Sequence, residues 1–343
     1  MPEQPGRDTT QHHSAKGRKL YSRLGFSKGY NVPLFVILAG AMLGFCLAKL
    51  PSLDVANQWS KAAAPGQWYW FQHGIYRIGI TLHLLTVIPA GILMVWQFVP
   101  AIRHRAILFH RINGYTVIVL LLLSNTGALM IVRRAFGGDL STQGAVGVLV
   151  IATTTGLFMA YYNIKKLQIE QHRAWMLRTM LYFGTIITTR LIMIISAQIL
   201  SKIGSYYVTT TCGELLSMRS VEYVGTKYPA CLGANATTVE EQLVPVLVFF
   251  GSNIEEIGAS LKAPFGMSLW IAIFLHGVGV EIYLALTPRE AQRLRQVSYE
   301  RQLEAGYPNP GSAGLVIENF GDADQWCAAN VSQKEQRDVN TNE

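Results

Sequence analysis

Six long apolar segments dominate this sequence of 343 residues. Each segment has about the 20 residues that an α-helix needs to cross the apolar core of a lipid bilayer. The predicted spans are residues 32–50, 79–99, 115–132, 145–162, 177–200 and 267–286. Half of all residues are hydrophobic and 15% are charged, so little charge remains for a large soluble domain. The sequence therefore predicts an all-α fold, a polytopic membrane helix bundle with about six transmembrane helices.

The positions of these spans divide the chain into regions. Residues 1–31 are polar and basic, and no short cleavable apolar segment precedes the first span, so we expect that span to remain as an anchor. Residues 32–286 form the transmembrane helical domain, with a long loop at residues 201–265. The apolar stretch 243–250 is short and contains Pro245, so a lumenal or interfacial segment is expected there rather than a seventh span.

A polar tail, residues 287–343, follows the last span. It begins with the sequence TPRE, which matches a threonine N-cap, a proline at the first helical position and a glutamate at the third. We expect a charged helix from there to about Glu304. The chain after Pro310 is predicted to be disordered.

Basic residues set the predicted orientation, because loops rich in Lys and Arg usually stay in the cytosol. A cytosolic N-terminus places the basic clusters within residues 16–28, 103–111, 165–178 and 289–295 on the cytosolic side. Arg133 and Arg134 fall on the other side and oppose this assignment. The count favours cytosolic N- and C-termini, and it accounts for the net charge of +8 without nucleic-acid binding. We expect a multi-pass protein of the endomembrane system or plasma membrane, surrounded by membrane lipid.

The long loop carries two further signals of its side. Cys212 and Cys231 can form a disulfide that closes a ring of about 20 residues, contributing ~3 kcal/mol to the order of the loop. Two unrelated thiols are the alternative. Asn235 begins the sequon Asn-Ala-Thr, a predicted glycosylation site. Disulfides and N-glycans form on the lumenal or extracellular side, where the basic residues also place this loop.

Polar side chains at membrane depth are the candidates for chemistry, because a charge there costs at least ~3 kcal/mol. Arg190 lies near the middle of the fifth predicted span, and His276 and Glu281 lie in the sixth. We predict that these three form a catalytic buried polar site, in which the long Arg190 side chain reaches Glu281. A structural ion pair between helices carries equal weight. The sequence has no phosphate-binding glycine loop, nucleophile elbow or zinc-spaced Cys/His cluster.

A pair of histidines is a second candidate site. His110 and His172 each precede a predicted span by about five residues, so they lie at matching depth. Membrane cytochromes hold haem b between histidines of neighbouring helices, which makes this pair a candidate cofactor site. Interfacial anchoring and the binding of an anionic group remain open as alternatives. His83 and His276 differ in depth by roughly 9 Å, which suits two ligands of one iron poorly.

The same histidines carry a resemblance to a known family. The sequence reads FHRINGY from residue 109 and QHRAWMLR from residue 171, with Arg190 downstream. With these residues the chain resembles, from about residue 81 to 201, a family of membrane proteins catalogued as domain of unknown function 2306. The resemblance implies a helical membrane domain and no established activity, cofactor or catalytic residue. The long loop and extended tail look like fungal elaborations, and such proteins can accompany specialised-metabolite pathways.

Two functions of different classes follow. In the first, the protein is a membrane-embedded enzyme or redox component that acts on a lipophilic small molecule. In the second, it is a non-catalytic transporter or scaffold, and its buried polar residues form a gate or a structural pair. Six spans without a clear inverted repeat argue against a transporter, whereas the lack of a recognisable nucleophile or carboxylate pair argues against an enzyme.

Overall fold

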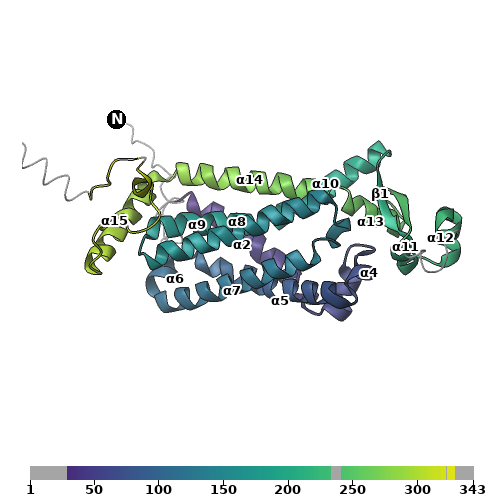
Figure 1. Cartoon of the computed structure of the whole chain (residues 1–343), viewed down its shortest axis with the longest axis horizontal. Coiled ribbons are helices and arrows are strands. Elements are labelled where there is room, and N and C mark those ends of the chain that lie inside the picture. The colour runs from purple at the N-terminus through teal and green to yellow at the C-terminus, as the bar shows by residue number, and fades with distance from the viewer. Residues whose placement is uncertain (1–28, 233–240, 322, 329–343) are drawn as a thin grey trace, which may run out of the picture. The chain divides into compact units, whose positions relative to one another are not determined.

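The computed structural model describes residues 29–232, 241–321 and 323–328. Within these residues, six helical segments are long and apolar enough to cross a membrane, which confirms the predicted polytopic helical fold (Figure 1). In chain order these segments are Asn31–Ala48, Gly74–Gln97, Ile107–Ile131, Leu140–Lys165, Ile169–Ile203 and Ile254–Ala285. The chain divides into two compact units, which are described separately.

The first unit comprises Met1–Ala135, Thr209–Val246 and Gly251–Gly258, and its long helices are α2 (Asn31–Ala48), α5 (Gly74–Gln97) and α7 (Ile107–Ile131). Helices α5 and α7 pack closely where Gly79 meets Gly127. A β-carbon on Gly127 would lie 2.7 Å from the amide nitrogen of His83 and 2.8 Å from the carbonyl oxygen of Gly79. Small residues at this crossing therefore allow the two backbones to approach each other, as is common between membrane helices.

Short elements connect these helices. They are η1 (Leu50–Leu53), η2 (Val55–Trp59), α3 (Ser60–Ala62), α4 (Gln67–Phe71) and α6 (Pro100–Arg105). The Trp70 indole in α4 donates a hydrogen bond to the Glu214 carboxylate at 3.0 Å, and the Arg134 guanidinium carbon lies 3.6 Å from the centre of a Trp70 ring. Arg134, which opposes the predicted orientation, therefore has a structural contact of its own.

The long loop folds into β1 (Tyr207–Thr211), α11 (Cys212–Met218), α12 (Val221–Lys227), η4 (Pro229–Cys231), β2 (Leu243–Leu247) and α13 (Ile254–Lys262). Strands β1 and β2 pair, so the apolar stretch around Pro245 is a strand and not a span. Its alternating side chains Val244, Val246 and Val248 are buried. The predicted disulfide between Cys212 and Cys231 is confirmed, with α-carbons 5.6 Å apart. The sequon at Asn235 lies outside the described residues.

A buried carboxylate stabilises this loop. The side chain of Glu255 is fully buried and accepts hydrogen bonds from Arg219 at 2.9 Å, Tyr223 at 2.8 Å and Lys227 at 2.9 Å. Burial alone would lower the pKa of Lys227, but its hydrogen bonds to Glu256 and Glu255 raise that pKa above the ordinary value. The cluster is therefore charged at neutral pH, and each charge has a partner.

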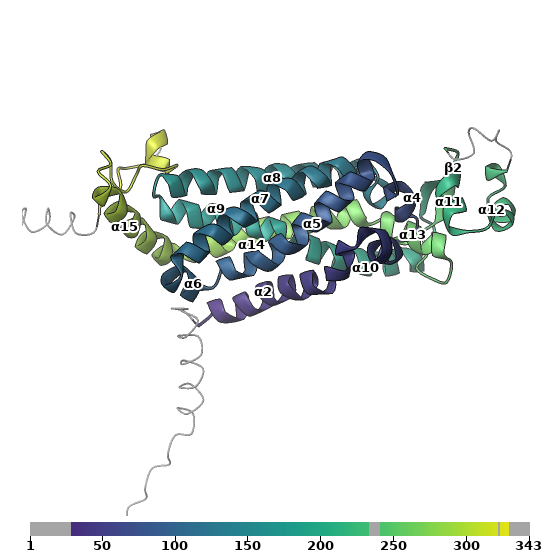
Figure 2. The same cartoon turned by 90° about the horizontal axis from the view of Figure 1, so that it is seen from below.

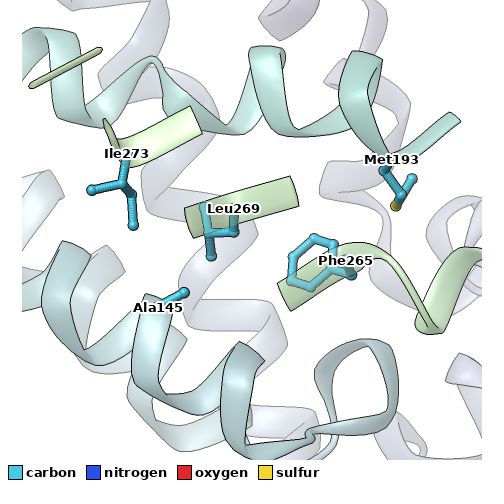
Figure 3. Packing of buried hydrophobic residues seen from close by; sticks show 5 residues of the cluster. All are labelled: Ala145, Met193, Phe265, Leu269 and Ile273. Atoms are coloured by element: carbon cyan, nitrogen blue, oxygen red, sulfur yellow. The ribbon is translucent and has the colours of Figure 1, made fainter. Parts of the chain in front are cut away.

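The second unit comprises Phe136–Val208, Leu247–Phe250 and Ala259–Glu343. Its long helices are α8 (Leu140–Lys165), α9 (Ile169–Phe183), α10 (Thr185–Ile203), α14 (Phe265–Ala285) and α15 (Pro288–Glu304). Figure 3 shows how α8, α10 and α14 bury Ala145, Met193, Phe265, Leu269 and Ile273 against one another. This apolar packing holds together the helices that carry Arg190 (α10) and His276 (α14).

The fifth span, Ile169–Ile203, contains a one-residue turn at Gly184 that divides it into two helices, α9 and α10. Helix α9 ends at Phe183, the amide of Gly184 donates to the carbonyls of Met180 and Leu181, and α10 begins at Thr185. Glycine has the weakest helix propensity apart from proline, which accounts for an interruption at this position. The Gly184 amide keeps its helical bond to Met180, but other backbone groups at this break need partners that a continuous helix would not require.

The tail agrees with the prediction in part. Helix α15 has the expected length, but its predicted capping box is wrong, because the Thr287 hydroxyl donates to the Tyr283 carbonyl at 3.0 Å instead of capping α15. The predicted disorder after Pro310 is also wrong for residues 311–321. The chain there packs beside the turn between α8 and α9 (Figure 2), with η5 at Ile317–Phe320.

Candidate functional site

Arg190 packs against aromatic rings in the second unit. Its guanidinium carbon lies 4.5 Å from the ring centre of Phe136 and 5.7 Å from that of Phe265. The two rings stack with their centres 4.1 Å apart. The only polar contact of the guanidinium within the described residues is from Nη1 to the Met193 sulfur, at 4.0 Å. Because Phe136 precedes α8 and Phe265 begins α14, the Arg190 side chain lies at the end of those helices and not at their middle.

His276 lies beside the break between α9 and α10. Its Nδ1 lies 2.6 Å from the carbonyl oxygen of Leu181, near the end of α9, and its Nε2 lies 2.8 Å from the hydroxyl of Thr188 in α10. The hydroxyl of Thr185 donates to the Tyr182 carbonyl at 2.8 Å. A histidine on α14 thus bridges the two halves of the interrupted span and supplies a donor to a carbonyl at the end of α9.

Glu281 pairs with an arginine other than the predicted one. Arg178 donates from Nε to Oε1 at 2.6 Å and from Nη2 to Oε2 at 2.9 Å, which is a bidentate ion pair. The predicted pairing of Arg190 with Glu281 is wrong, because Arg190 contacts Phe265, which lies about 24 Å from Glu281 along α14. His276 lies between Phe265 and Glu281 along α14, so Arg190, His276 and Glu281 do not form one cluster.

The two candidate haem ligands lie in different units. His110 is in the first turn of α7, and its backbone carbonyl accepts a hydrogen bond from the Gln97 side chain at 3.2 Å. His172 is in the first turn of α9, and its Nδ1 lies 2.9 Å from the carbonyl oxygen of Ala160. The pairing of these histidines around haem b stays a prediction. Within the described residues, no group of three or more His, Cys, Asp or Glu side chains could hold a metal ion.

Three residues of the site were not assigned from the sequence. Gly184 interrupts an apolar segment, and an isolated glycine is a recognised signal of a weakened helix. Thr188 stands two positions before Arg190, but its contact with His276 depends on the packing of α10 on α14. No local pattern marks Phe136, whose ring contacts residues that are far from it in the chain.

Comparisons with known proteins agree with the helical membrane fold. Residues 80–220 match the model of a family described as "Predicted membrane protein (DUF2306)". The chain is 23% identical over 324 residues to "Ava biosynthesis cluster protein G" of Aspergillus versicolor, and this alignment covers 80% of the chain and 94% of that protein. No solved structure matches the chain. The resemblance inferred from the His-Arg segments is thereby confirmed, and the protein is a multi-pass membrane protein similar over residues 80–220 to this uncharacterised family.

Proposed function

We propose that this protein acts on a lipophilic small molecule within the membrane, as an enzyme of a fungal specialised-metabolite pathway. The observation that carries the proposal is the interruption of a membrane helix at Gly184 directly beside His276. Interrupted membrane helices and polar side chains at membrane depth are typical of places where a substrate or ion is handled. The printed name of the relative from Aspergillus versicolor, which refers to a biosynthesis cluster, supports the pathway setting.

The hydrogen bonds of His276 determine which ring nitrogen carries the proton in the neutral imidazole. The Leu181 carbonyl can only accept, so Nδ1 donates to it. Nε2 is then an acceptor, and the Thr188 hydroxyl donates to it. A substrate hydroxyl that displaces Thr188 would meet a nitrogen able to take its proton, which is the arrangement of a general base.

The test is complementation of a deletion strain with variants, followed by mass spectrometry of cell extracts and medium. His276→Gln keeps a side-chain donor for the Leu181 carbonyl but removes the imidazole base. We expect it to lower product formation at least about tenfold, because a positioned acid–base group contributes roughly 10²–10⁴ in rate. Normal product formation by a His276→Gln protein present at the normal level would contradict the proposal.

His83→Gln is the matched control, since His83 is also within a membrane helix and its Nδ1 also lies close to a main-chain carbonyl, that of Ser124 at 3.1 Å. We expect this variant to support normal product formation. Tagged protein levels, measured for both variants, separate loss of function from loss of folding.

Transport is the second candidate function, and the same interruption at Gly184 favours it, because alternating-access carriers use discontinuous helices. The experiment separates the two functions by where material accumulates. An enzyme defect leaves an unconverted precursor in the deletion strain. A transport defect leaves the finished product, retained in the cells and missing from the medium.

A further inference from the structure

We propose that Arg190 binds the anionic head group of an amphiphile, through a carboxylate or a phosphate. The inference deepens the proposed function and rests on it for the statement that this amphiphile is the substrate. Binding at Arg190 can be measured without any knowledge of the pathway. The site consists of the Arg190 guanidinium, the stacked rings of Phe136 and Phe265, and the exposed apolar face of α10 described below.

Arg190 has no counter-charge among the residues that the structure describes. A guanidinium has five N–H donors, and among the described residues that of Arg190 meets only the Met193 sulfur and two aromatic rings. Cation–π contacts contribute about 0.5–2 kcal/mol, and they give the N–H donors of the guanidinium no oxygen acceptor. Arg178, by contrast, has Glu281 as a bidentate partner in the same unit. An anion from outside the chain would supply what Arg190 lacks.

The aromatic rings beside Arg190 are held in a fixed geometry. Phe136 has φ 49° and ψ 45°, a left-handed conformation that is uncommon for a residue other than glycine. This conformation lies in the short turn η3 (Ala135–Gly137), and the ring stacks on Phe265, which is buried. Contact with the rings restrains the guanidinium, and a restrained planar fork is suited to bidentate binding of a carboxylate or phosphate.

An exposed apolar face of α10 leads to Arg190. One face of α10 is apolar from the residue after Arg190 onward, and its members are 47–61% exposed: Leu191, Ile194, Ile195 and Ile199. In a bilayer this face contacts the acyl chains, so a molecule that reaches Arg190 along it must itself be lipophilic. An anionic group on a lipophilic body defines the ligand class as an amphiphile.

The experiment measures binding to the full chain, purified in an uncharged detergent, by displacement of a fluorescent fatty acid. The competitors are oleate, oleyl alcohol and dioleoyl phosphatidate. We expect at least one of the two anions to bind about ten- to a hundredfold more tightly than oleyl alcohol, as a charge-assisted hydrogen bond predicts. Preference for oleate identifies a lipophilic carboxylic acid, and preference for phosphatidate identifies a phospholipid head group. Equal binding of all three would overturn the inference.

Variants assign any preference to this side chain. Arg190→Gln and Arg190→Met both remove the charge. Methionine is in addition an unbranched apolar side chain that can pack against the rings, and we expect at least one of the two variants to fold. Either folded variant should bind the anion and oleyl alcohol equally. Lys202→Gln, at the other end of α10, is the matched control and should keep the preference. If Arg190→Met folds and keeps it, the anion binds elsewhere and the proposal fails.

The two proposals can fail separately. If Arg190 shows no anion preference while His276→Gln still lowers product formation, the enzyme proposal stands without this site. If the anion binds at Arg190 but deletion of the gene changes no metabolite, the site stands and the pathway function fails.

Discussion

Glu318, in the chain that follows α15, illustrates how single carboxylates hold this protein together. It accepts a hydrogen bond from Arg295 Nη1 at 2.8 Å, and its side chain is 5% exposed. The hydrogen bond from Arg295 lowers the pKa of Glu318 below its ordinary value, although burial by itself would raise it. The ion pair therefore stabilises the packed tail only while Glu318 is ionised.

The pH dependence of the packed tail follows from this pair. Because the pKa of Glu318 is lower in the folded protein, the stabilisation is fully present above the unfolded value of about 4.3 and disappears as the pH falls through the folded value. We expect pepsin to cleave near Leu315 and Phe320 faster in Glu318→Gln than in the wild type at pH 5, and equally fast at the lowest pH.

The control for this measurement is Glu304→Gln, which removes an exposed ion pair with Arg301 on α15. Exposed pairs contribute little, so this variant should follow the wild-type profile at every pH. If Glu318→Gln follows the wild type as well, the Arg295 pair does not hold the tail.

At the level of helices, the crossing of α5 and α7 depends on glycine. Alanine is normally the better helix residue by about 0.8–1 kcal/mol. At Gly127, however, a methyl group would collide with the backbones of Gly79 and His83. Backbone atoms cannot rotate away, so the two helices would have to separate.

Gly127→Ala is therefore expected to destabilise the protein by about 1–3 kcal/mol, the usual cost of overpacking. The measurement is the midpoint of thermal unfolding in detergent, followed by loss of the monodisperse peak in size-exclusion chromatography. Gly147→Ala on α8 is the matched control, since its new β-carbon would meet no atom within 4 Å. Equal midpoints for the two variants would show that α5 and α7 can separate without cost.

At the level of the whole molecule, the tail and the membrane helices of the second unit are one structure. Gln168, in the turn between α8 and α9, is fully buried. Its side-chain oxygen Oε1 accepts hydrogen bonds from the Gly314 backbone amide and from the Gln302 side chain. Its side-chain nitrogen Nε2 donates to the Gly311 backbone carbonyl. The Gln168 side chain therefore makes hydrogen bonds with three polar groups of the tail. The tail in turn covers the turn between α8 and α9, which precedes the second His-Arg segment.

Gln168→Ala should release this tail. Leaving buried polar groups without partners costs about 1–3 kcal/mol, so we expect amide hydrogen exchange of residues 311–320 to become roughly 5- to 150-fold faster. Gln292→Ala, on an exposed position of α15, is the control and should leave exchange unchanged. Unchanged exchange in Gln168→Ala would mean that other contacts suffice to hold the tail.

The sequence alone determined the features of this protein that depend on local pattern. Apolar length predicts all six spans, because crossing a bilayer requires about 20 such residues in a row whatever their partners are. The disulfide between Cys212 and Cys231 was predictable because the loop contains two cysteines at a separation that closes readily. Helix α15 was predictable because proline at the first turn and glycine after the last are local signals.

Only the tertiary structure decided which polar groups meet. The charges of Arg190 and Glu281 suggested that they form an ion pair. In the structure Glu281 pairs with Arg178, and Arg190 makes cation–π contacts with two phenylalanines. The predicted disorder was wrong for residues 311–321 for the same reason, because a polar sequence does not reveal that the side chains of Gln168 and Asn163 accept hydrogen bonds from backbone amides of the tail. Hydropathy records how much a residue avoids water, whereas the choice among equally suitable partners depends on helix crossings that residues far apart in the chain determine together.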